Sequence, residues 1–321
     1  LFGKNTTAGA FNITSRAAEF KPGAVFEASY GNYGYIQAKA SITGPLIANK
    51  LAARVSFSGT QRDGMLYNVN SDRKINDLNN LGGRAQLLFT PSDNVKISLA
   101  GDVTTQKPDG YGWAVAGVVK TQRSDYRQFN NIIADLGYTI PYKSAFERKV
   151  DLDTRSKADN ELGGVSLNAD IKIGNGTLTS TSAWRYWKWV PLNDRDYLGI
   201  PAFTVSAGNS LHDQWSQEFR YSGKVGNKIT GVIGVYGLWQ DLKTDPVHTE
   251  EAGSALWRFY QPNADATTWE TPGLLDNFGI KTTYGIKSTS LAAFGQIDWS
   301  VTSKLHVLPG LRYNYDKKVA N

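Results

Sequence analysis

The stretch Val95 to Thr104, VKISLAGDVT, alternates apolar and polar side chains along its whole length. Its odd positions, V-I-L-G-V, are apolar or small, and its even positions, K-S-A-D-T, are mostly polar. A period of two places the two sets on opposite faces of a β-strand, so this stretch predicts a strand that is buried on one face only. Roughly ten residues is also the length of one strand in a membrane barrel.

The same alternation returns at four other places, and this repetition decides the fold class. Residues 163–173, 215–222, 290–301 and 304–316 carry mainly apolar side chains at odd positions and mainly polar ones at even positions. The polar face of each stretch is hydrophilic enough to line water. We therefore expect an all-β protein, an antiparallel transmembrane β-barrel.

The connections between the predicted strands alternate between short and long. The compact ones are rich in turn-forming residues and lie at 44–50 (GPLIANK), 91–94 (PSDN), 174–176 (GNG), 226–227 (GN) and 302–303. The others lie at 31–32 and at about 63–80, 106–160, 191–212 and 242–286. Outer-membrane barrels have this asymmetry, with short periplasmic turns and long external loops. About eleven strands are expected, near 24–30, 33–43, 51–62, 82–90, 95–105, 161–173, 177–190, 213–224, 228–241, 287–301 and 304–316.

Composition excludes several other classes. The 321 residues include no Cys, which removes disulfides and thiolate metal sites. Mean hydropathy is −0.38, and no apolar run is long enough for a membrane helix. The net charge of +6 is spread thinly, without a basic run interleaved with aromatics, so no nucleic acid is expected as a partner.

Catalytic patterns are also absent from the sequence. His212, His248 and His306 lie far apart, and no HExxH or GxSxG motif occurs. The HTEE group at 248–251 is only a weak pattern for a metal site. We expect these side chains to be solvated charges of a loop. We expect no enzyme, no cofactor and no metal site.

The two ends predict that the chain is a piece of a longer protein. It starts at Leu1 without the features of a signal peptide. An odd number of strands does not close a bacterial single-chain barrel, so more strands are expected beyond Asn321 if this is a barrel. The final YNYDKKVAN, residues 313–321, is expected to begin another external loop.

Residues 1–16, LFGKNTTAGAFNITSR, resemble the end of the plug domain of TonB-dependent outer-membrane receptors. The matching residues are Leu1, Phe2, Gly3, Asn5, Thr6, Gly9, Asn12, Ile13 and Arg16. Their chemistry alone describes a glycine-rich turn and a short strand, and GKN lacks the frame of a phosphate loop. Further matches follow in the family's order at 29–34 (SYGNYG), 44–46 (GPL), 51–54 (LAAR), 62–64 (RDG) and 309–313 (PGLRY).

The resemblance implies a domain organisation and a function. Residues 1–22 would be the C-terminal end of the plug, and 23–321 the N-terminal half of a barrel of about 22 strands. The implied activity is TonB-dependent import of a scarce ligand across the bacterial outer membrane, most often a ferric siderophore. Oligosaccharide or cobalamin import and a passive porin-like channel remain alternatives, as does a secreted β-rich adhesin. The implied partners are the TonB complex of the inner membrane, reached through plug residues outside this chain, the ligand, and outer-membrane lipid.

Two sets of side chains on the predicted strands have expected roles. Charged residues on the polar faces would line the lumen and meet the plug, or stay simply solvated; they are Arg54, Arg84, Asp102, Asp170, Glu218, Arg220, Asp298 and Arg312. Aromatic residues near strand ends would form interfacial girdles; they are Trp184, Tyr186, Trp187, Trp189, Trp239, Trp299, Tyr313 and Tyr315. Trp187 and Trp189 are exceptions whose parity favours the opposite face, where they would stack on a ligand.

Ligand-binding residues are expected in the two longest loops, because loops on a rigid frame commonly carry binding. The main candidates are Tyr111, Trp113, Arg123, Arg127, Trp257 and Arg258, with Tyr126, Tyr138, His248, Glu250, Glu251 and Tyr260 beside them. Arginine together with Tyr or Trp suits an anionic aromatic ligand such as a ferric siderophore, and also an oligosaccharide. Packing between loops is the alternative explanation for each of these residues.

Overall fold

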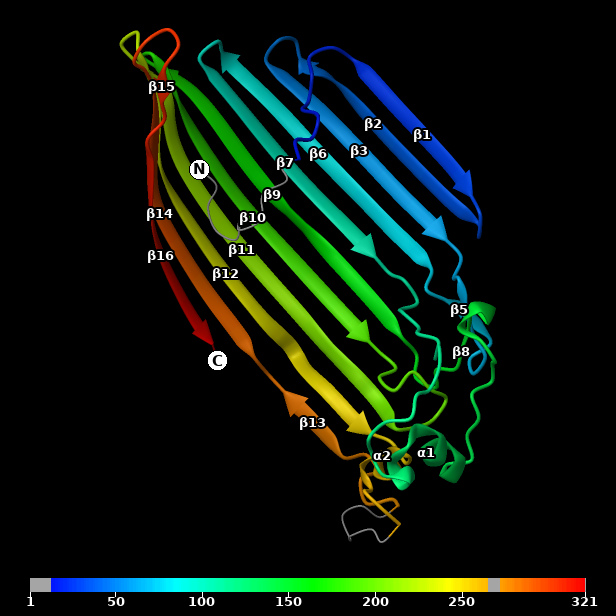
Figure 1. Cartoon of the computed structure of the whole chain (residues 1–321). Helices are drawn as coiled ribbons and strands as arrows, with labels where there is room; N and C mark the ends of the chain where they lie inside the picture. Colours follow the sequence, from blue (N-terminus) through cyan, green and yellow to red (C-terminus); the bar gives the residue numbers. More distant parts are fainter. Residues whose placement is uncertain (1–12, 265–271, 321) are drawn as a thin grey trace.

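The computed structural model describes residues 13–264 and 272–320, and its main element is one large antiparallel sheet (Figure 1). Among the described residues, eleven of the thirteen strands of this sheet are long and cross it in chain order. They are β1 (Gly23–Gly31), β2 (Tyr35–Ile47), β3 (Leu51–Arg62), β6 (Leu78–Ser92), β7 (Val95–Gln106), β9 (Lys157–Ile173), β10 (Gly176–Leu192), β11 (Phe203–Val225), β12 (Ile229–Ala252), β14 (Gly285–Ser300) and β16 (Gly310–Ala320). The short strands β13 (Gly279–Thr282) and β15 (His306–Val307) pair with β12 and β14. The predicted antiparallel wall of about eleven strands is confirmed, as an open sheet with β1 and β16 at its edges.

Strand register gives this wall two chemically different faces. Ser56 on β3 pairs with Arg84 on β6, which pairs with Asp102 on β7, so these polar side chains share one face. The intervening positions lie on the opposite face. Many of them are apolar and exposed, among them Ile42, Val55, Phe57, Leu81, Leu99, Leu167, Phe219, Ile233, Val235, Leu291 and Leu311. An apolar surface that runs across the wall is what contact with lipid requires. The alternation predicted from the sequence is therefore confirmed.

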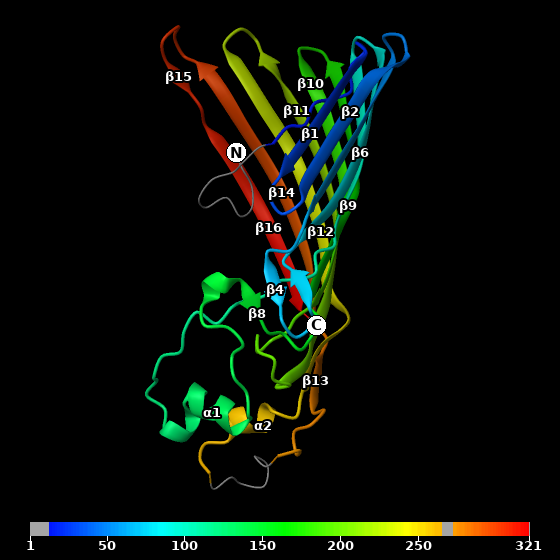
Figure 2. The same cartoon turned by 90° about the vertical axis from the view of Figure 1, so that its right-hand side faces the viewer.

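The wall is curved, and its polar face is the concave one. Figure 2 shows that residues 13–22 and the helices of the long loops lie on the concave side. Residues 13–22 contact Arg54, which shares a face with Gln86 and Ala100 through the ladder of β3, β6 and β7. We call the polar, concave face the inner face and the apolar face the outer face.

Short turns and long loops gather at opposite ends of the wall (Figure 1). The turns after β9 and β11 use Gly174 and Gly226 at φ of 57° and 65°, a conformation that favours glycine in tight hairpins. The long loops fall after β3, β7, β10 and β12. The predicted asymmetry is confirmed, and we call the two ends the turn end and the loop end.

Strands extend further toward the loop end than the sequence predicted. The segments 106–160, 191–212 and 242–286 were expected to be loops, but β9 begins at Lys157, β11 at Phe203, and β12 continues to Ala252. Beyond the lipid both faces of a strand meet polar surroundings, so the alternation that reveals a strand disappears there. These loop boundaries were wrong for that reason.

The expectation that 313–321 begins an external loop was also wrong for its described part. Residues up to Ala320 belong to β16 and pair with β14, with Asp316 opposite Ser290 and Ala320 opposite Ile286. The run DKK looks loop-like, yet backbone pairing with a neighbouring strand does not depend on side-chain polarity.

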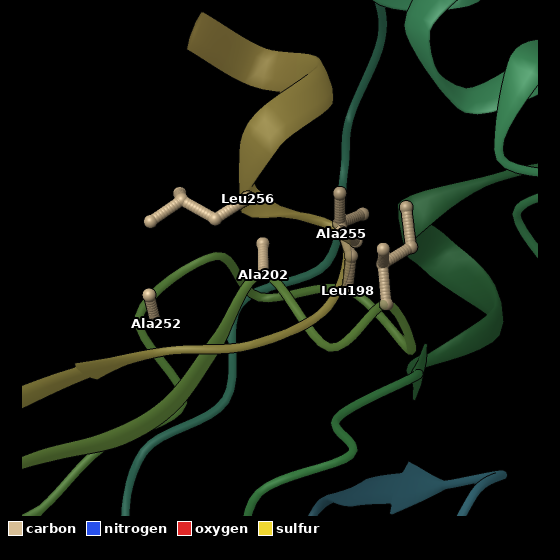
Figure 3. Packing of buried hydrophobic residues seen from close by; sticks show 6 residues of the cluster. Leu198, Ala202, Ala252, Ala255 and Leu256 are labelled. Atoms are coloured by element: carbon tan, nitrogen blue, oxygen red, sulfur yellow. The ribbon is translucent and has the colours of Figure 1, made fainter. Parts of the chain in front are cut away.

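The long loops pack together into a small unit, which we call the loop cap (63–77, 107–156, 193–202, 253–264 and 272–284). Its elements are the sheet β4 (Leu66–Asn68), β5 (Arg73–Ile75) and β8 (Lys149–Val150), the helices α1 (Phe129–Asp135) and α2 (Leu256–Tyr260), and 3-10 turns at Asp125–Arg127 and Ala145–Glu147. Figure 3 shows its larger core, where Leu198 and Ala202 meet Ala255 and Leu256. A second core contains Ile75, Val150 and Leu152. Among the described residues, no helix is long and apolar enough to cross a membrane.

Candidate functional site

The inner face carries the eight charged residues that were predicted to line the lumen. The ladder of β9, β10 and β11 places Asp170 in one row with Thr179 and Arg220, and the ladder of β12, β14 and β16 places Arg312 opposite Phe294. Arg54, Arg84, Asp102, Glu218 and Asp298 fall on the same face by the same registers. The inner face is thus a continuous polar surface with both signs of charge.

One charge network spans four strands of the inner face. Asp102 on β7 accepts hydrogen bonds from Arg84 Nη1 on β6 at 2.7 Å and from Arg185 Nη1 on β10 at 2.8 and 2.9 Å. Arg185 reaches Asp102 across β9, where the intervening position is Gly164. A Cβ atom at Gly164 would lie 2.9 Å from Arg185 Cδ, so the missing side chain is what makes room for this reach.

Two tryptophans form an aromatic surface on the inner face. Trp187 and Trp189 on β10 stack with ring centroids 6.1 Å apart and planes 11° apart. Trp187 Nε1 donates to Asn160 Oδ1 at 2.9 Å, and His212 lies opposite Trp187 on β11. These are the two residues whose parity favoured the face away from lipid, and the register agrees with that expectation.

The remaining girdle candidates lie on the outer face. Trp184 lies opposite Trp215, which lies opposite Trp239, so three rings form a row across β10, β11 and β12. Trp184 also stacks on Tyr186 at 5.3 Å. Trp299, Tyr313 and Tyr315 share this face by register. An amphipathic aromatic row at one depth is typical of the boundary between lipid and water.

The ligand candidates of the 107–156 loop stay near the surface of the loop cap. Tyr111 and Trp113 are 58% and 66% exposed, and Trp113 lies 6.1 Å from the ring of Tyr197. Arg123 is exposed, and Gln128 holds its carbonyl by a hydrogen bond. Arg127 is half-buried at the end of a 3-10 turn. Three of these four side chains are thus open to solvent.

Arg258 has a different environment, because its side chain is fully buried. Its Nε and Nη2 donate to Asp135 Oδ2 at 2.9 and 2.7 Å, and Nη2 also donates to the carbonyl of Tyr126 at 2.8 Å. Its guanidinium carbon lies 3.8 Å from the centroid of the Tyr126 ring. Arg258 therefore joins α2 to α1, which is packing between loops. Its neighbour Trp257 is half-buried.

Buried carboxyl groups form a feature that the sequence did not reveal. Asp194 accepts hydrogen bonds from the amides of Thr154 at 3.1 Å and Tyr197 at 2.8 Å, and burial raises its pKa to about 7. Asp196 accepts from the amides of Leu198 and Phe203, and burial raises its pKa to about 6. The available signal was the turn-like run NDRD at 193–196. Within 13–264 and 272–320, His, Asp and Glu side chains form no group arranged to hold a metal ion.

The plug motif residues Gly3, Asn5, Thr6, Gly9 and Asn12 lie outside the described residues. Ile13 and Arg16, at the end of that motif, are described and exposed.

Solved structures with the same fold are outer-membrane receptors. The ferric yersiniabactin uptake receptor of Yersinia pestis matches with a TM-score of 0.73 at 16% identity, over 100% of this chain and 43% of the receptor. The pyoverdine-bound receptor FpvA of P. aeruginosa matches with 0.66 at 11% identity, over 95% of this chain and 38% of the receptor. The ferric citrate transporter FecA matches with 0.59 at 12% identity, over 100% and 42%. No family model matches the chain.

These neighbours are TonB-dependent outer-membrane receptors and transport proteins, not enzymes. This chain spans less than half of their length. The resemblance seen in the sequence is confirmed at the level of the fold: the chain has the fold of part of the barrel wall of the TonB-dependent outer-membrane receptors.

Proposed function

We propose that this chain is part of a receptor that imports a scarce ligand across the bacterial outer membrane with energy supplied by the TonB complex. Residues 1–22 are then the end of the plug, and 23–321 are about half of the barrel wall. The loop end faces outward and the turn end faces the periplasm. Outer-membrane lipid contacts the outer face, and no enzymatic activity is part of the proposal.

The observation that carries this proposal is the segment 13–22 held against the inner face. Arg54 Nε donates to the carbonyl of Ala17 at 2.8 Å, and the amide of Glu19 donates to Thr43 Oγ1 at 3.0 Å. A passive porin needs a water-filled lumen, so chain fixed along its inner wall favours a plugged receptor.

A ferric siderophore is the ligand we propose. Its acidic or aromatic groups suit the exposed Tyr111, Trp113 and Arg123 of the loop cap and the stacked rings of Trp187 and Trp189 on the inner face. The structurally similar receptors carry ferric yersiniabactin and pyoverdine, which supports this choice. Stacked tryptophans also suit sugar rings, so oligosaccharide is the second candidate, and cobalamin is a third.

Uptake by whole cells tests the proposal. Cells that carry only the full-length receptor are given a panel of radioiron-loaded siderophores, a labelled oligosaccharide and labelled cobalamin, with and without a protonophore. We expect accumulation of one iron chelate that stops when the proton motive force is removed. Uptake that continues under the protonophore contradicts active import. Energy-dependent uptake of the sugar or of cobalamin alone overturns the choice of ligand only.

A further inference from the structure

Residues 13–22 are not held evenly along their length. Ile13 is 91% exposed, and among the described residues Ser15 has one hydrogen bond, a long one of 3.5 Å from Gln86 Nε2. Two residues further on, Ala17 and Glu19 bind the wall through several short contacts, and Ala18 is buried between them. The change from loose to firm attachment falls at Ala17.

Arg54 is the centre of this attachment. Its guanidinium makes three contacts with three different groups: Nε donates to the Ala17 carbonyl at 2.8 Å, Nη1 to Ser41 Oγ at 3.1 Å, and Nη2 to Glu19 Oε1 at 3.2 Å. The side chain is only 8% exposed. A buried guanidinium that binds a backbone carbonyl fixes the main chain itself, not only a flexible side chain.

The wall beneath Arg54 completes the anchor. Thr43, which lies opposite Arg54 on β2, accepts from the Glu19 amide and donates to the carbonyl of Ala53 at 2.9 Å. Ala52 is fully buried there. We call residues 17–22 the strap. One set of hydrogen bonds thus ties the strap to β2 and β3, next to the start of β1 at Gly23.

We propose that Arg54 and Thr43 form a mechanical stop: when the plug is pulled, chain before Ala17 rearranges while Ala17 to Pro22 stays on the wall. The proposal rests on the proposed function, because only a receptor with a plug experiences such a pull. The stop keeps the force away from the pairing of β1 with β2, so the barrel is not unzipped from its first strand.

Cysteine labelling in the full-length receptor tests the stop. The 321 residues contain no Cys, so Ala18→Cys, with any cysteine elsewhere in the receptor replaced, provides a single reporter at a buried position of the strap. In resting outer-membrane vesicles we expect slow reaction with a maleimide, and at least about tenfold faster reaction when Arg54→Ala is added, since a hydrogen bond to a charged group is worth about that factor or more. Equal rates in the two backgrounds overturn the proposal.

Two further variants separate the anchor from a general loosening of the wall. Arg84→Ala removes the same side chain from the same face but has no described contact with the strap, and it should leave the labelling rate unchanged. Glu19→Gln should change it less than threefold, because Glu19 is 56% exposed and the bonds to the Ala17 carbonyl and to Thr43 remain. If Arg84→Ala accelerates labelling as much as Arg54→Ala does, the anchor is not specific and the proposal fails.

Force measurement covers the case in which Ala18→Cys itself disturbs the strap. The receptor in a bilayer is pulled from its N-terminus. The length of chain that is extended shows at which residue unfolding of the plug stops before the barrel wall. Arg54→Ala should move this stop by about six residues, roughly 20 Å of extended chain. An unchanged stop overturns the proposal.

The labelling of resting receptor needs neither ligand nor TonB, so the two proposals fail separately. Slow, Arg54-dependent labelling in a receptor that imports nothing leaves the anchor in place and removes the function. In energised cells that import the ligand, labelling of Ala18→Cys should stay as slow as at rest. Faster labelling on energisation contradicts the stop while import stands.

Discussion

Arg185 and Asp102 lie 83 positions apart in the sequence, and their side chains are joined by two hydrogen bonds of 2.8 and 2.9 Å that pass over Gly164. The contact ties β7 to β10 over the strand between them. It exists because β9 presents a hydrogen atom, and not a side chain, at the crossing point. A Cβ at Gly164 would lie 2.1 Å from the carbonyl oxygen of Trp184, too close for any real contact.

Substitution of Gly164 should therefore destabilise the wall. We expect Gly164→Ala to lower the free energy of unfolding by about 1–3 kcal/mol, because the backbone of β10 must shift and Arg185 loses its path to Asp102. Gly83→Ala on β6 is the matched control, since nothing lies within 4 Å of its added Cβ. Urea unfolding of the receptor in detergent micelles measures both. Equal stability of the two variants would mean that the passage of Arg185 over Gly164 does not contribute to the stability of the wall.

Arg258 should hold the loop cap together. Arg258→Met removes a buried charge that binds Asp135 and the carbonyl of Tyr126, and we expect it to weaken the local stability of the cap by about 2–4 kcal/mol. Hydrogen exchange should accelerate in α1 and α2 and stay unchanged in β7 and β9. Arg123→Ala, an exposed arginine in the loop that carries α1, should change neither. Unchanged exchange in α1 after Arg258→Met would show that the apolar core alone joins the two helices.

The stability of the loop cap should fall as pH rises. Burial raises the pKa of Asp194 to about 7 and that of Asp196 to about 6, whereas an unfolded Asp titrates near 4. Between these values the folded cap binds more protons than the unfolded chain, so the contribution of both groups is complete below about pH 4 and is lost by about pH 7.

Hydrogen exchange of residues 193–202 at pH 5 and pH 8, corrected for the intrinsic exchange rates, measures this dependence. Protection should decrease toward pH 8 in the wild type. Asp194→Asn keeps a carbonyl that accepts from the amides of Thr154 and Tyr197 and should flatten the profile. Asp125→Asn, at an exposed position, should leave the profile as it is. A wild-type profile that rises with pH would contradict the direction of these pKa shifts.

Trp187 and Trp189 should contribute to capture of the ligand. Replacing both with Ala removes the stacked surface of the inner face, and about a tenfold or larger loss of affinity is expected. Trp184→Ala, on the same strand but on the outer face, should leave affinity unchanged and reduce stability in the membrane. Binding of the identified ligand to purified receptor measures this difference. Equal affinity of the double variant and the wild type would restrict recognition to the loop cap.

Much of the wall was predictable because lipid imposes a simple rule on the sequence. Each residue of a spanning strand faces either lipid or the polar inner side, so the positions of Arg54, Asp102 and Arg312 followed from parity alone. Parity also predicted that Trp187 and Trp184 lie on opposite faces of their strand. The same rule does not operate outside the lipid, which is why the ends of β11 and β12 and the continuation of β16 over 317–320 were missed.

The loop cap was not predictable, because its contacts join residues that are distant in the chain and carry no periodic signal. Arg258 looked like a ligand residue by type, and only its burial against Asp135 shows its structural role. In the sequence, Gly164 is only a small residue in an alternating strand. Its role follows from the contact between Arg185 and Asp102, which the sequence does not predict. Asp194 and Asp196 owe their raised pKa values to burial by segments far from NDRD in sequence.

The central claim is that alternate positions of each long strand face lipid and a filled polar interior, with the odd positions facing lipid in β7. Nitroxide labels placed one at a time at residues 97–103 of β7, in the full-length receptor in a bilayer, test it directly through collision with dissolved oxygen, which concentrates in lipid. Accessibility should peak at 97, 99, 101 and 103 and fall at 98, 100 and 102. Uniform accessibility, or a period of two with the opposite phase, would contradict the account.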